Sequence, residues 1–297
     1  MLDHLIESFF IQIQRGEPWS NPFERHFGKL TDHEWTEILV KSINNSNIDG
    51  CIFPPFPSNE LQASIHGFGG DIAIRGATDF RNFVKRNTPH DIFSRLDRRM
   101  LDYGCGWGRI SRAFLRDFPI ENIYAFEPDK RLSAIARALN PYITITTGNF
   151  TPPTVFGNGA FDMIVGYSVF SHLPEGLAKD WLEEFSRLLR PGGCIAITTW
   201  GERFINRLAV ERENMENGQQ IHRYSELVIN SAGNLAGLLQ RFRSGDFVFL
   251  SSSPSTTYGE TFIPRAAMER ILPNTLSIFK HDSFSLAQDV FLLVKDT

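Results

Sequence analysis

The sequence predicts an α/β protein in which a mostly parallel sheet carries helices on both faces. Between Arg98 and Trp200, short β-rich apolar runs alternate with helical patterns, which is the order of elements in a parallel sheet. A glycine-rich turn joins the first of these runs to a helix. The chain has 297 residues, 42% of them hydrophobic and 22% charged, so it can bury a core of ordinary globular composition.

The region before this pattern is expected to be mainly helical. Apolar residues recur at helical spacing over residues 2–13. A second helix begins after Thr31, because Thr31 and Glu34 have the spacing of a capping box. We therefore expect residues 1–94 to form a helical N-terminal cap and substrate region, and residues 95–297 to form the α/β domain.

The α/β domain is expected to contain eight strands and three clear helices. Apolar runs bounded by turn residues place the strands at Met100–Tyr103, Asn122–Glu127, Tyr142–Thr147, Phe161–Tyr167, Cys194–Thr199, Phe247–Ser251, Leu276–Lys280 and Val290–Lys295. Helices are expected over Trp107–Asp117 and Pro128–Leu139. A third opens at Pro174 and ends at Arg190-Pro-Gly-Gly193. The less regular stretch at about 201–262 is expected to be an insertion.

Composition excludes several classes of protein. Thirty basic and 34 acidic residues give a formal charge of −4, which disfavours a nucleic-acid partner. Cys51, Cys105 and Cys194 are far apart and contain no C-x-x-C pair, so we expect neither a disulfide framework nor a zinc site. We expect a cytoplasmic protein without membrane insertion, because no run is apolar enough to span a bilayer and the acidic N-terminus is unlike a signal peptide.

The most informative stretch is the turn that follows the first strand of the α/β domain. Glycines at 104, 106 and 108 permit a tight turn and a close approach of a ligand to the backbone. The N-terminus of the next helix favours an anionic group. The spacing is G-x-G-x-G, and Arg109 stands where a dinucleotide fingerprint has its last glycine, which argues against a nicotinamide-dependent oxidoreductase. Glu127 ends the next strand, where a carboxylate can accept both hydroxyls of a ribose.

Residues 98–200 resemble the class I S-adenosylmethionine-dependent methyltransferases. The resemblance rests on five motifs in the right order: Asp102-Tyr-Gly-Cys-Gly-Trp-Gly108, Glu127, Gly148-Asn-Phe150, Phe161–Pro174 and Leu189-Arg-Pro-Gly-Gly193. It implies a Rossmann-like, seven-stranded sheet in which the seventh strand is antiparallel to its neighbours, with the two C-terminal runs as the last strands. It also implies S-adenosyl-L-methionine as the cofactor.

The resemblance implies a set of cofactor-binding residues. They are Asp102, Gly104, Cys105, Gly106, Glu127, Pro128, Asn149, Phe150 and Tyr167. Asp102 would hold the methionine amino group, Glu127 the ribose, and Asn149 and Phe150 the adenine. Asn149 stands where many members of the family have Asp. Two alternatives remain open: Asp102 as a cap at the strand end, and Pro128 as ordinary packing.

A hydroxyl acceptor would benefit from a general base, and His172 is the expected catalytic residue. It follows the fourth strand of the α/β domain at the carboxyl edge of the sheet, where ligands bind in such folds. The competing interpretation is a structural role beside the next helix. Tyr224 and Tyr258 lie in irregular segments, as parts of either a solvated loop or a lid. The loop that ends at His172 lacks the acidic pairs of metal-dependent members, so no metal is expected.

The sequence therefore predicts a metal-independent methyltransferase that acts on a small-molecule acceptor, at a hydroxyl oxygen of a saccharide or natural product. The carboxyl group of a natural product is the alternative acceptor. Two alternatives stay open: a non-catalytic S-adenosylmethionine-binding module and a nicotinamide-dependent oxidoreductase. The 26 phenylalanines either fill a core or line an aromatic pocket. The aromatic residues of the N-terminal region that could line such a pocket are Phe9, Phe10, Trp19, Phe23, Phe27 and Trp35.

Overall fold

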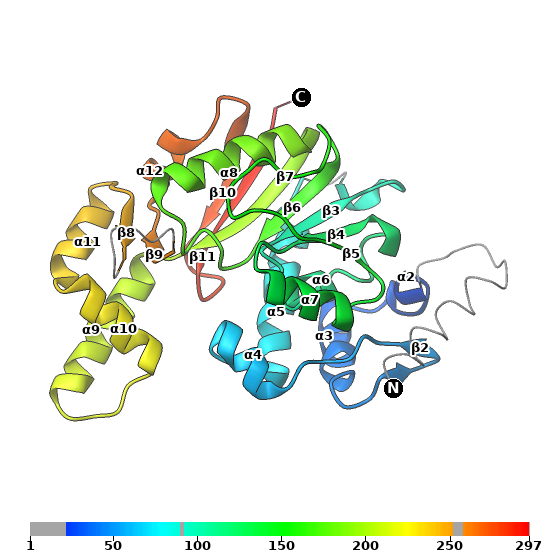
Figure 1. The fold of residues 1–297 in the computed structure, drawn as a ribbon, viewed down its shortest axis with the longest axis horizontal. Helices are drawn as coiled ribbons and strands as arrows, with labels where there is room; N and C mark the ends of the chain where they lie inside the picture. The colour runs from blue at the N-terminus through cyan, green and yellow to red at the C-terminus, as the bar shows by residue number, and fades with distance from the viewer. Residues whose placement is uncertain (1–21, 90–91, 252–257, 297) are drawn as a thin grey trace. The chain divides into compact units, whose positions relative to one another are not determined.

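The computed structural model describes residues 22–89, 92–251 and 258–296, and it contains a seven-stranded sheet (Figure 1). In spatial order the strands are β10 (Leu276–Asp282), β11 (Asp289–Lys295), β7 (Leu189–Thr199), β6 (Phe161–Gly166), β3 (Met100–Tyr103), β4 (Ile123–Phe126) and β5 (Thr144–Thr146). The α/β fold class predicted from the sequence is confirmed. The helix expected over residues 2–13 lies outside the described residues.

The chain divides into two compact units. Unit 1 comprises residues 1–150 and 161–163, and unit 2 comprises residues 151–160 and 164–297. The domain boundary expected at residue 94 stays a prediction.

The strands of unit 1 run parallel. β3 pairs with β4 and β4 pairs with β5, each in parallel register. β3 is buried along its whole length, as a continuous apolar run in a parallel sheet should be. All three strands lie inside the ranges that the sequence predicted, and β4 and β5 are shorter than expected at both ends.

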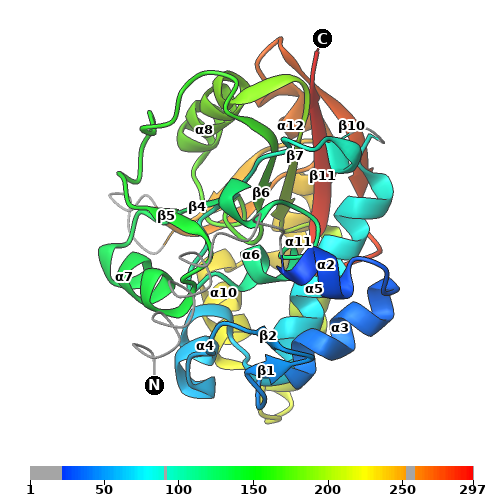
Figure 2. The same cartoon turned by 90° about the vertical axis from the view of Figure 1, so that its right-hand side faces the viewer.

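The N-terminal part of unit 1 is mainly helical, as expected. Its helices are α2 (Pro22–Phe27), α3 (Asp32–Lys41), α4 (Asn59–His66) and α5 (Gly70–Asn87), and α3 packs along α5 (Figure 2). The predicted capping box is present, because the Thr31 hydroxyl accepts from the Glu34 N–H and the Glu34 carboxylate accepts from the Thr31 N–H. A two-stranded hairpin, β1 (Asn47–Ile48) and β2 (Cys51–Ile52), was not predicted.

The aromatic residues of this part of unit 1 fill its core. Phe23, Phe27 and Trp35 are 0–2% exposed. The Trp35 ring meets both phenylalanine rings, and all three rings meet Phe53, in edge-on or tilted contacts. The Trp35 indole N–H donates to the Ala113 carbonyl, so the one polar atom of that ring is satisfied. Core packing is therefore the role of these three side chains. Phe9, Phe10 and Trp19 lie outside the described residues.

The helix that follows the glycine turn is much shorter than predicted. The sequence predicted Trp107–Asp117, whereas α6 covers only Arg109–Ala113 and continues as turns. The next helix, α7 (Lys130–Leu139), begins two residues later than predicted. The Asp129 carboxylate accepts from two backbone N–H groups of its first turn and so sets the start of the helix.

The sheet strands of unit 2 end in an antiparallel edge. β11 runs antiparallel to both β7 and β10, which confirms the expected role of the two C-terminal runs. α8 (Glu175–Leu188) packs on β7, and Pro174 is its N-cap rather than its first residue. β7 begins at Leu189, immediately after α8, so it is five residues longer than predicted.

The predicted insertion of unit 2 forms a small helical layer with its own core. It contains α9 (Glu202–Glu216), α10 (Arg223–Ala232), α11 (Leu235–Arg243) and the antiparallel pair β8 (Val248–Leu250) and β9 (Glu260–Phe262) (Figure 1). Apolar side chains from all five elements meet in one cluster. β9 was not predicted. α12 (Arg265–Ile271) then leads to β10.

Two expectations from composition can be compared with the described residues. The thiols of Cys51, Cys105 and Cys194 are buried. Within the described ranges, no helix combines the length and the apolar character that a bilayer span requires.

Candidate functional site

The glycine turn of unit 1 has the backbone conformation that its sequence predicts. Gly104, Gly106 and Gly108 have φ values of 68°, 56° and 91°, all in the region that favours glycine. The Gly104 N–H donates to the Phe126 carbonyl at 2.8 Å, which fixes the start of the turn against the end of β4. The turn is therefore held at the carboxyl end of β3, next to the end of β4.

The third glycine has a packing role. A Cβ on Gly108 would lie 2.5 Å from the Asn140 side-chain amide. That amide donates to the Trp107 carbonyl at 2.7 Å and its oxygen accepts from Arg112 at 2.8 Å. The close approach of Gly108 to Asn140 thus joins the end of the turn to the end of α7.

Glu127 lies against the same turn. Its Oε2 accepts from the Gly106 N–H at 2.8 Å and its Oε1 accepts from the Asp129 N–H at 3.0 Å. The residue is 6% exposed, and burial raises the pKa of its carboxyl to about 7, against the two backbone N–H groups that favour the anion. The predicted ribose ligand and the glycine turn are therefore in direct contact.

Asp102 is used within the fold. Its Oδ2 accepts from the Ser111 N–H at 2.9 Å and from the Ser111 hydroxyl at 2.6 Å, so the carboxylate ties the end of β3 to α6. Burial raises the pKa of Asp102 to about 6, although the Ser111 donors and the Arg109 guanidinium lower it. The cap at the strand end is present, and a contact with the methionine amino group stays a prediction.

The other expected cofactor residues of unit 1 differ in exposure. Cys105 is buried and packs against Ala125 and Ala136. Pro128 is partly buried, and Asn149 and Phe150 are exposed. The backbone before Asn149 runs close to the Phe126 ring, because a Cβ on Gly148 would lie 2.4 Å from it. Glycine is required at 148 for this approach.

In unit 2, the segment after β6 carries Tyr167 and a strained serine. Tyr167 is partly buried. Ser168 has a φ of 60°, which is uncommon for a residue with a side chain and often marks a functional segment. Its N–H donates to the Thr198 hydroxyl at 2.7 Å, and its hydroxyl accepts from the Gln288 amide at 2.8 Å. These bonds hold the segment in its unusual conformation.

His172 is fixed by β9 and its flanking residues. Its Nδ1 lies 2.8 Å from the Gly259 carbonyl, which can only accept, so Nδ1 carries the proton and Nε2 carries the lone pair. The imidazole stacks on the Tyr258 ring at 4.5 Å between centroids. Burial lowers the pKa of His172, against the hydrogen bond to Gly259 that raises it. The imidazole is therefore neutral near pH 7, as a general base must be.

A buried carboxylate lies beside His172, and the sequence did not point to it. Glu260 Oε1 is 3.6 Å from His172 Nδ1. Its Oε2 accepts from the Trp200 indole N–H at 2.9 Å and from the Tyr224 hydroxyl. Burial raises the pKa of Glu260 to about 7, although these two donors lower it. Tyr224 is partly buried on α10, so the solvated-loop interpretation of this residue is wrong.

The expected site residues fall into two groups. Asp102, Gly104, Cys105, Gly106, Glu127, Pro128, Asn149 and Phe150 belong to unit 1, and Tyr167 and His172 belong to unit 2. Among the described residues, no cluster of three or more His, Cys, Asp or Glu side chains could hold a metal ion.

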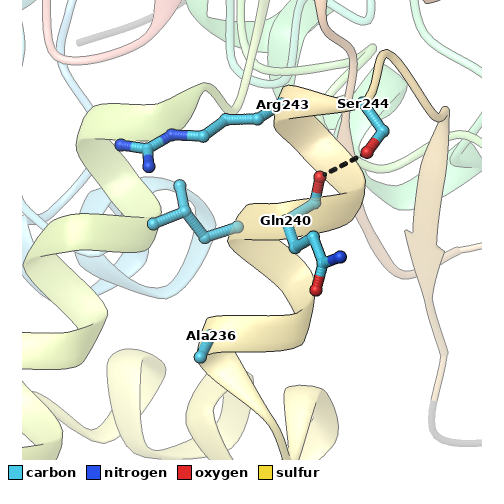
Figure 3. A pocket seen from close by; sticks show the side chains of 5 residues that line it. Ala236, Gln240, Arg243 and Ser244 are labelled. Atoms are coloured by element: carbon cyan, nitrogen blue, oxygen red, sulfur yellow. Dashed lines mark hydrogen bonds between the residues drawn. The ribbon is translucent and has the colours of Figure 1, made fainter.

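A surface hollow of about 360 Å³ lies on α11, remote from both groups along the chain. Ala236, Leu239, Gln240, Arg243 and Ser244 line it (Figure 3). The Ser244 hydroxyl donates back to the Gln240 carbonyl, and Arg243 pairs with Glu202 on α9. The hydroxyl of Ser244 and the guanidinium of Arg243 are thus engaged in ordinary helix contacts.

Comparison with known proteins finds a similarity over part of the α/β region. Residues 100–193 match a family described as a methyltransferase domain. An uncharacterized methyltransferase of Anoxybacillus flavithermus is 30% identical over 112 residues, which are 38% of this chain and 50% of that protein. A malonyl-[acyl-carrier protein] O-methyltransferase of Halalkalibacterium halodurans is 26% identical over 135 residues, 40% of this chain and 49% of that protein. The chain therefore spans about half the length of these curated relatives.

A solved structure supports the fold. CalS10, an amino pentose methyltransferase of Micromonospora echinaspora, aligns with a TM-score of 0.50 at 13% identity, over 81% of this chain and 98% of its own. At this identity the likeness concerns the fold alone. The family match covers β3 to the start of β7, so it includes the glycine turn, Glu127 and His172.

Proposed function

We propose that this chain, whose residues 100–193 match a methyltransferase domain, is a class I methyltransferase that transfers the methyl group of S-adenosylmethionine to a hydroxyl oxygen of a small-molecule acceptor. The observation that carries the choice of a hydroxyl is the tautomer of His172. With Nδ1–H bonded to Gly259, the basic Nε2 is the atom that can accept a proton.

The residues of the glycine turn fit the cofactor. An ionised carboxylate has about four acceptor positions, and Glu127 uses two of them on backbone N–H groups. The remaining positions can accept the two ribose hydroxyls. Gly104 and Gly106 have positive φ angles and carry no side chain, so a cofactor can approach the backbone of the turn closely. Glu127 and the glycine turn would therefore hold the adenosine, and Asn149 and Phe150 would border the adenine.

The bound cofactor supplies an electrophilic methyl group on a sulfonium whose departure leaves a neutral thioether. The protein then has two tasks. It aligns the acceptor oxygen, which can contribute an effective molarity of about 10⁵–10⁸ M. His172 Nε2 takes the hydroxyl proton, a contribution of about 10²–10⁴-fold. The neutral state of His172 near pH 7 suits this second task.

A saccharide is the acceptor class that we favour. Tyr258 is 66% exposed and stacks on the His172 imidazole, so an aromatic surface on which a sugar ring could pack lies next to the base. The protein's formal charge of −4 gives no attraction for a polyanion such as nucleic acid. A natural-product hydroxyl is the second choice within the same chemistry. Metal independence and a cytoplasmic location remain predictions from the sequence.

A carboxyl acceptor is the rival that one relative favours, because the Halalkalibacterium halodurans protein is named for malonyl-[acyl-carrier protein]. A carboxylate is already ionised near pH 7 and needs no general base. The two acceptor classes therefore differ in their dependence on His172, and this difference can be measured.

The test is a methyl-transfer assay with radiolabelled S-adenosylmethionine and a panel of monosaccharides, nucleotide sugars, phenols and malonyl thioesters, with and without EDTA. We expect transfer to a hydroxyl compound, and a loss of about 10²–10⁴-fold in kcat for His172→Ala. The control is His33→Ala, because His33 is exposed on α3. Transfer to malonyl thioesters alone, with His172→Ala fully active, would contradict the proposal.

A further inference from the structure

Glu260 and His172 form a largely buried pair in unit 2. Their side chains are 14% and 13% exposed, and the nearest atoms are Glu260 Oε1 and His172 Nδ1, 3.6 Å apart. The Nδ1 proton points to the Gly259 carbonyl, and Gly259 precedes Glu260 in the chain. One short segment therefore presents both a carbonyl and a carboxylate to the same nitrogen.

The carboxylate is held in place from the opposite side. Trp200, at the end of β7, and Tyr224, on α10, both donate to Oε2. Oε2 is thus engaged by two donors, and Oε1 is the oxygen that faces the imidazole. Trp200 is itself fixed by stacking on Phe204, with 3.9 Å between ring centroids.

The backbone around Gly259 leaves little freedom for this arrangement. The Gly259 N–H donates to the His172 carbonyl at 3.1 Å, and the Thr261 N–H donates to the Ser171 carbonyl at 2.8 Å. A Cβ on Gly259 would lie 2.2 Å from the Leu250 carbonyl oxygen of β8. The segment Gly259–Thr261 is therefore hydrogen-bonded to the His172 segment on one side and packs closely against β8 on the other.

We propose that Glu260 is the positioning residue of the reaction: its carboxylate, 3.6 Å from His172 Nδ1, compensates the positive charge that forms on the imidazole when Nε2 takes the acceptor proton. This inference rests on the proposed function. In the step, the acceptor O–H bond breaks and an N–H bond forms at Nε2. The electron pair left on oxygen forms the O–C bond, and the C–S pair stays on sulfur. His172 is then a cation 3.6 Å from a carboxylate oxygen.

The location of the pair makes the compensation effective. A charge pair largely removed from water interacts more strongly than the same pair in solvent. Without the carboxylate, the imidazolium would form in a largely buried place, at the full cost of desolvation. The titratable groups that face Glu260 are His172, Tyr224 and Tyr258, and the phenol pKa values of both tyrosines are raised by burial and by Glu260. Both phenols therefore stay neutral over the pH range in which Glu260 ionises.

The first test uses the whole protein without cofactor or acceptor, so it does not depend on the proposed function. Histidine-labelled protein is titrated by two-bond ¹H–¹⁵N NMR, which reports the tautomer and the pKa of each ring. In the wild type we expect His172 in the Nδ1–H form. In Glu260→Gln we expect the pKa of His172 to fall, because an anionic carboxylate 3.6 Å away favours the charged imidazole. An unchanged titration of His172 in Glu260→Gln would overturn the proposal.

The second test measures kcat against pH with the acceptor found by the methyl-transfer assay. We expect the wild-type rate to rise with pH to a plateau above about 7, where Glu260 is ionised. In Glu260→Gln this rise should move to lower pH, where His172 alone titrates, and kcat should fall about 10–100-fold, with little change in KM. The matched control is Glu226→Gln, because Glu226 is exposed on the same helix as Tyr224. Full kcat in Glu260→Gln would contradict the compensating role.

Two further variants keep the proposal testable if Glu260→Gln does not fold. Tyr224→Phe and Trp200→Phe each remove one donor to Oε2 and keep an aromatic ring in place. Each should shift the titration of His172 in NMR and lower kcat less than Glu260→Gln does. If both leave the titration and kcat unchanged, the carboxylate does not act through this network. If the titration shifts but no acceptor is methylated, the proposed function fails and the coupling of the pair stands.

Discussion

The Glu127 carboxylate accepts a hydrogen bond from the Gly106 N–H at 2.8 Å, so the acidic residue at the end of β4 is in direct contact with the glycine turn at the end of β3. This contact places a hydrogen-bond acceptor where a ribose would lie beside the turn. We therefore expect the two elements to act as one cofactor site, and each of them should be necessary for binding.

Replacement of Glu127 by Ala should weaken binding of S-adenosylhomocysteine by about 100-fold, because hydrogen bonds to a charged group contribute about 1.5–3 kcal/mol. Isothermal titration calorimetry measures the affinity directly. The control is Glu121→Ala, since Glu121 is exposed just before β4 and should bind as the wild type does. Wild-type affinity in Glu127→Ala would rule out Glu127 as the ribose ligand.

Cofactor affinity should rise with pH. Burial raises the pKa of Glu127 to about 7, so below that pH the free protein holds a proton on the carboxyl. Binding through both ribose hydroxyls requires the anion, so the proton must leave first. Affinity should therefore increase about tenfold between pH 6 and pH 8 and level off above, following the ionised fraction of one group. Calorimetry at pH 6, 7 and 8 tests this, and Glu127→Gln should bind weakly with no such rise.

Replacement of Gly108 by Ala should destabilise the protein by about 2 kcal/mol or more. A side chain at a φ of 91° costs about 1–2 kcal/mol, and the added Cβ would lie 2.5 Å from the Asn140 amide. The matched control is Gly176→Ala in α8, where the Cβ meets nothing within 4 Å. That variant should gain about 0.5 kcal/mol from helix propensity. Denaturant unfolding of both variants measures the difference, and equal stabilities would refute it.

Replacement of Arg81 by Ala should destabilise the protein by about 3 kcal/mol. The Arg81 guanidinium is 0% exposed and pairs with Asp117 and Asp32, so its removal leaves the buried Asp117 carboxylate with Lys85 alone and Asp32 with Arg116 alone. Arg75→Ala is the control, because the pair that Arg75 forms with Glu37 is 42–45% exposed and contributes no more than about 1 kcal/mol. Chemical denaturation measures the free energy of unfolding of both variants. A similar decrease in both would show that the buried ion pairs of Arg81 stabilise the protein no more than the exposed pair does.

Local patterns in the sequence predicted most of the elements that carry the fold. The continuous apolar runs at β3 and β6 and the capping box at Thr31 each have a strong local signal, and the structure contains all three. α6 was predicted too long, because the turns after Ala113 have helical composition but are held by tertiary contacts. Arg98, for example, donates to the Asp117 carbonyl at the end of these turns.

Only part of the candidate site could be predicted from the sequence. Glu127 could be predicted, because it ends a clear strand next to a glycine turn. Glu260 could not, because β9 has three residues and exists only through its pairing with β8 and its bonds to the His172 segment. The two donors of Glu260 come from Trp200 and Tyr224, which are distant in sequence. Contacts of this kind have no local pattern.

The most direct test of the cofactor site is thermal unfolding with S-adenosylmethionine, S-adenosylhomocysteine and NAD in parallel. A ligand at 100 times its Kd stabilises the folded state by about 2.7 kcal/mol, which is about 5–10 °C in Tm for a protein of this size. We expect this shift with the two adenosyl amino acids and none with NAD. A shift with NAD alone, or with none of the three, would contradict a methyltransferase cofactor site in the glycine turn.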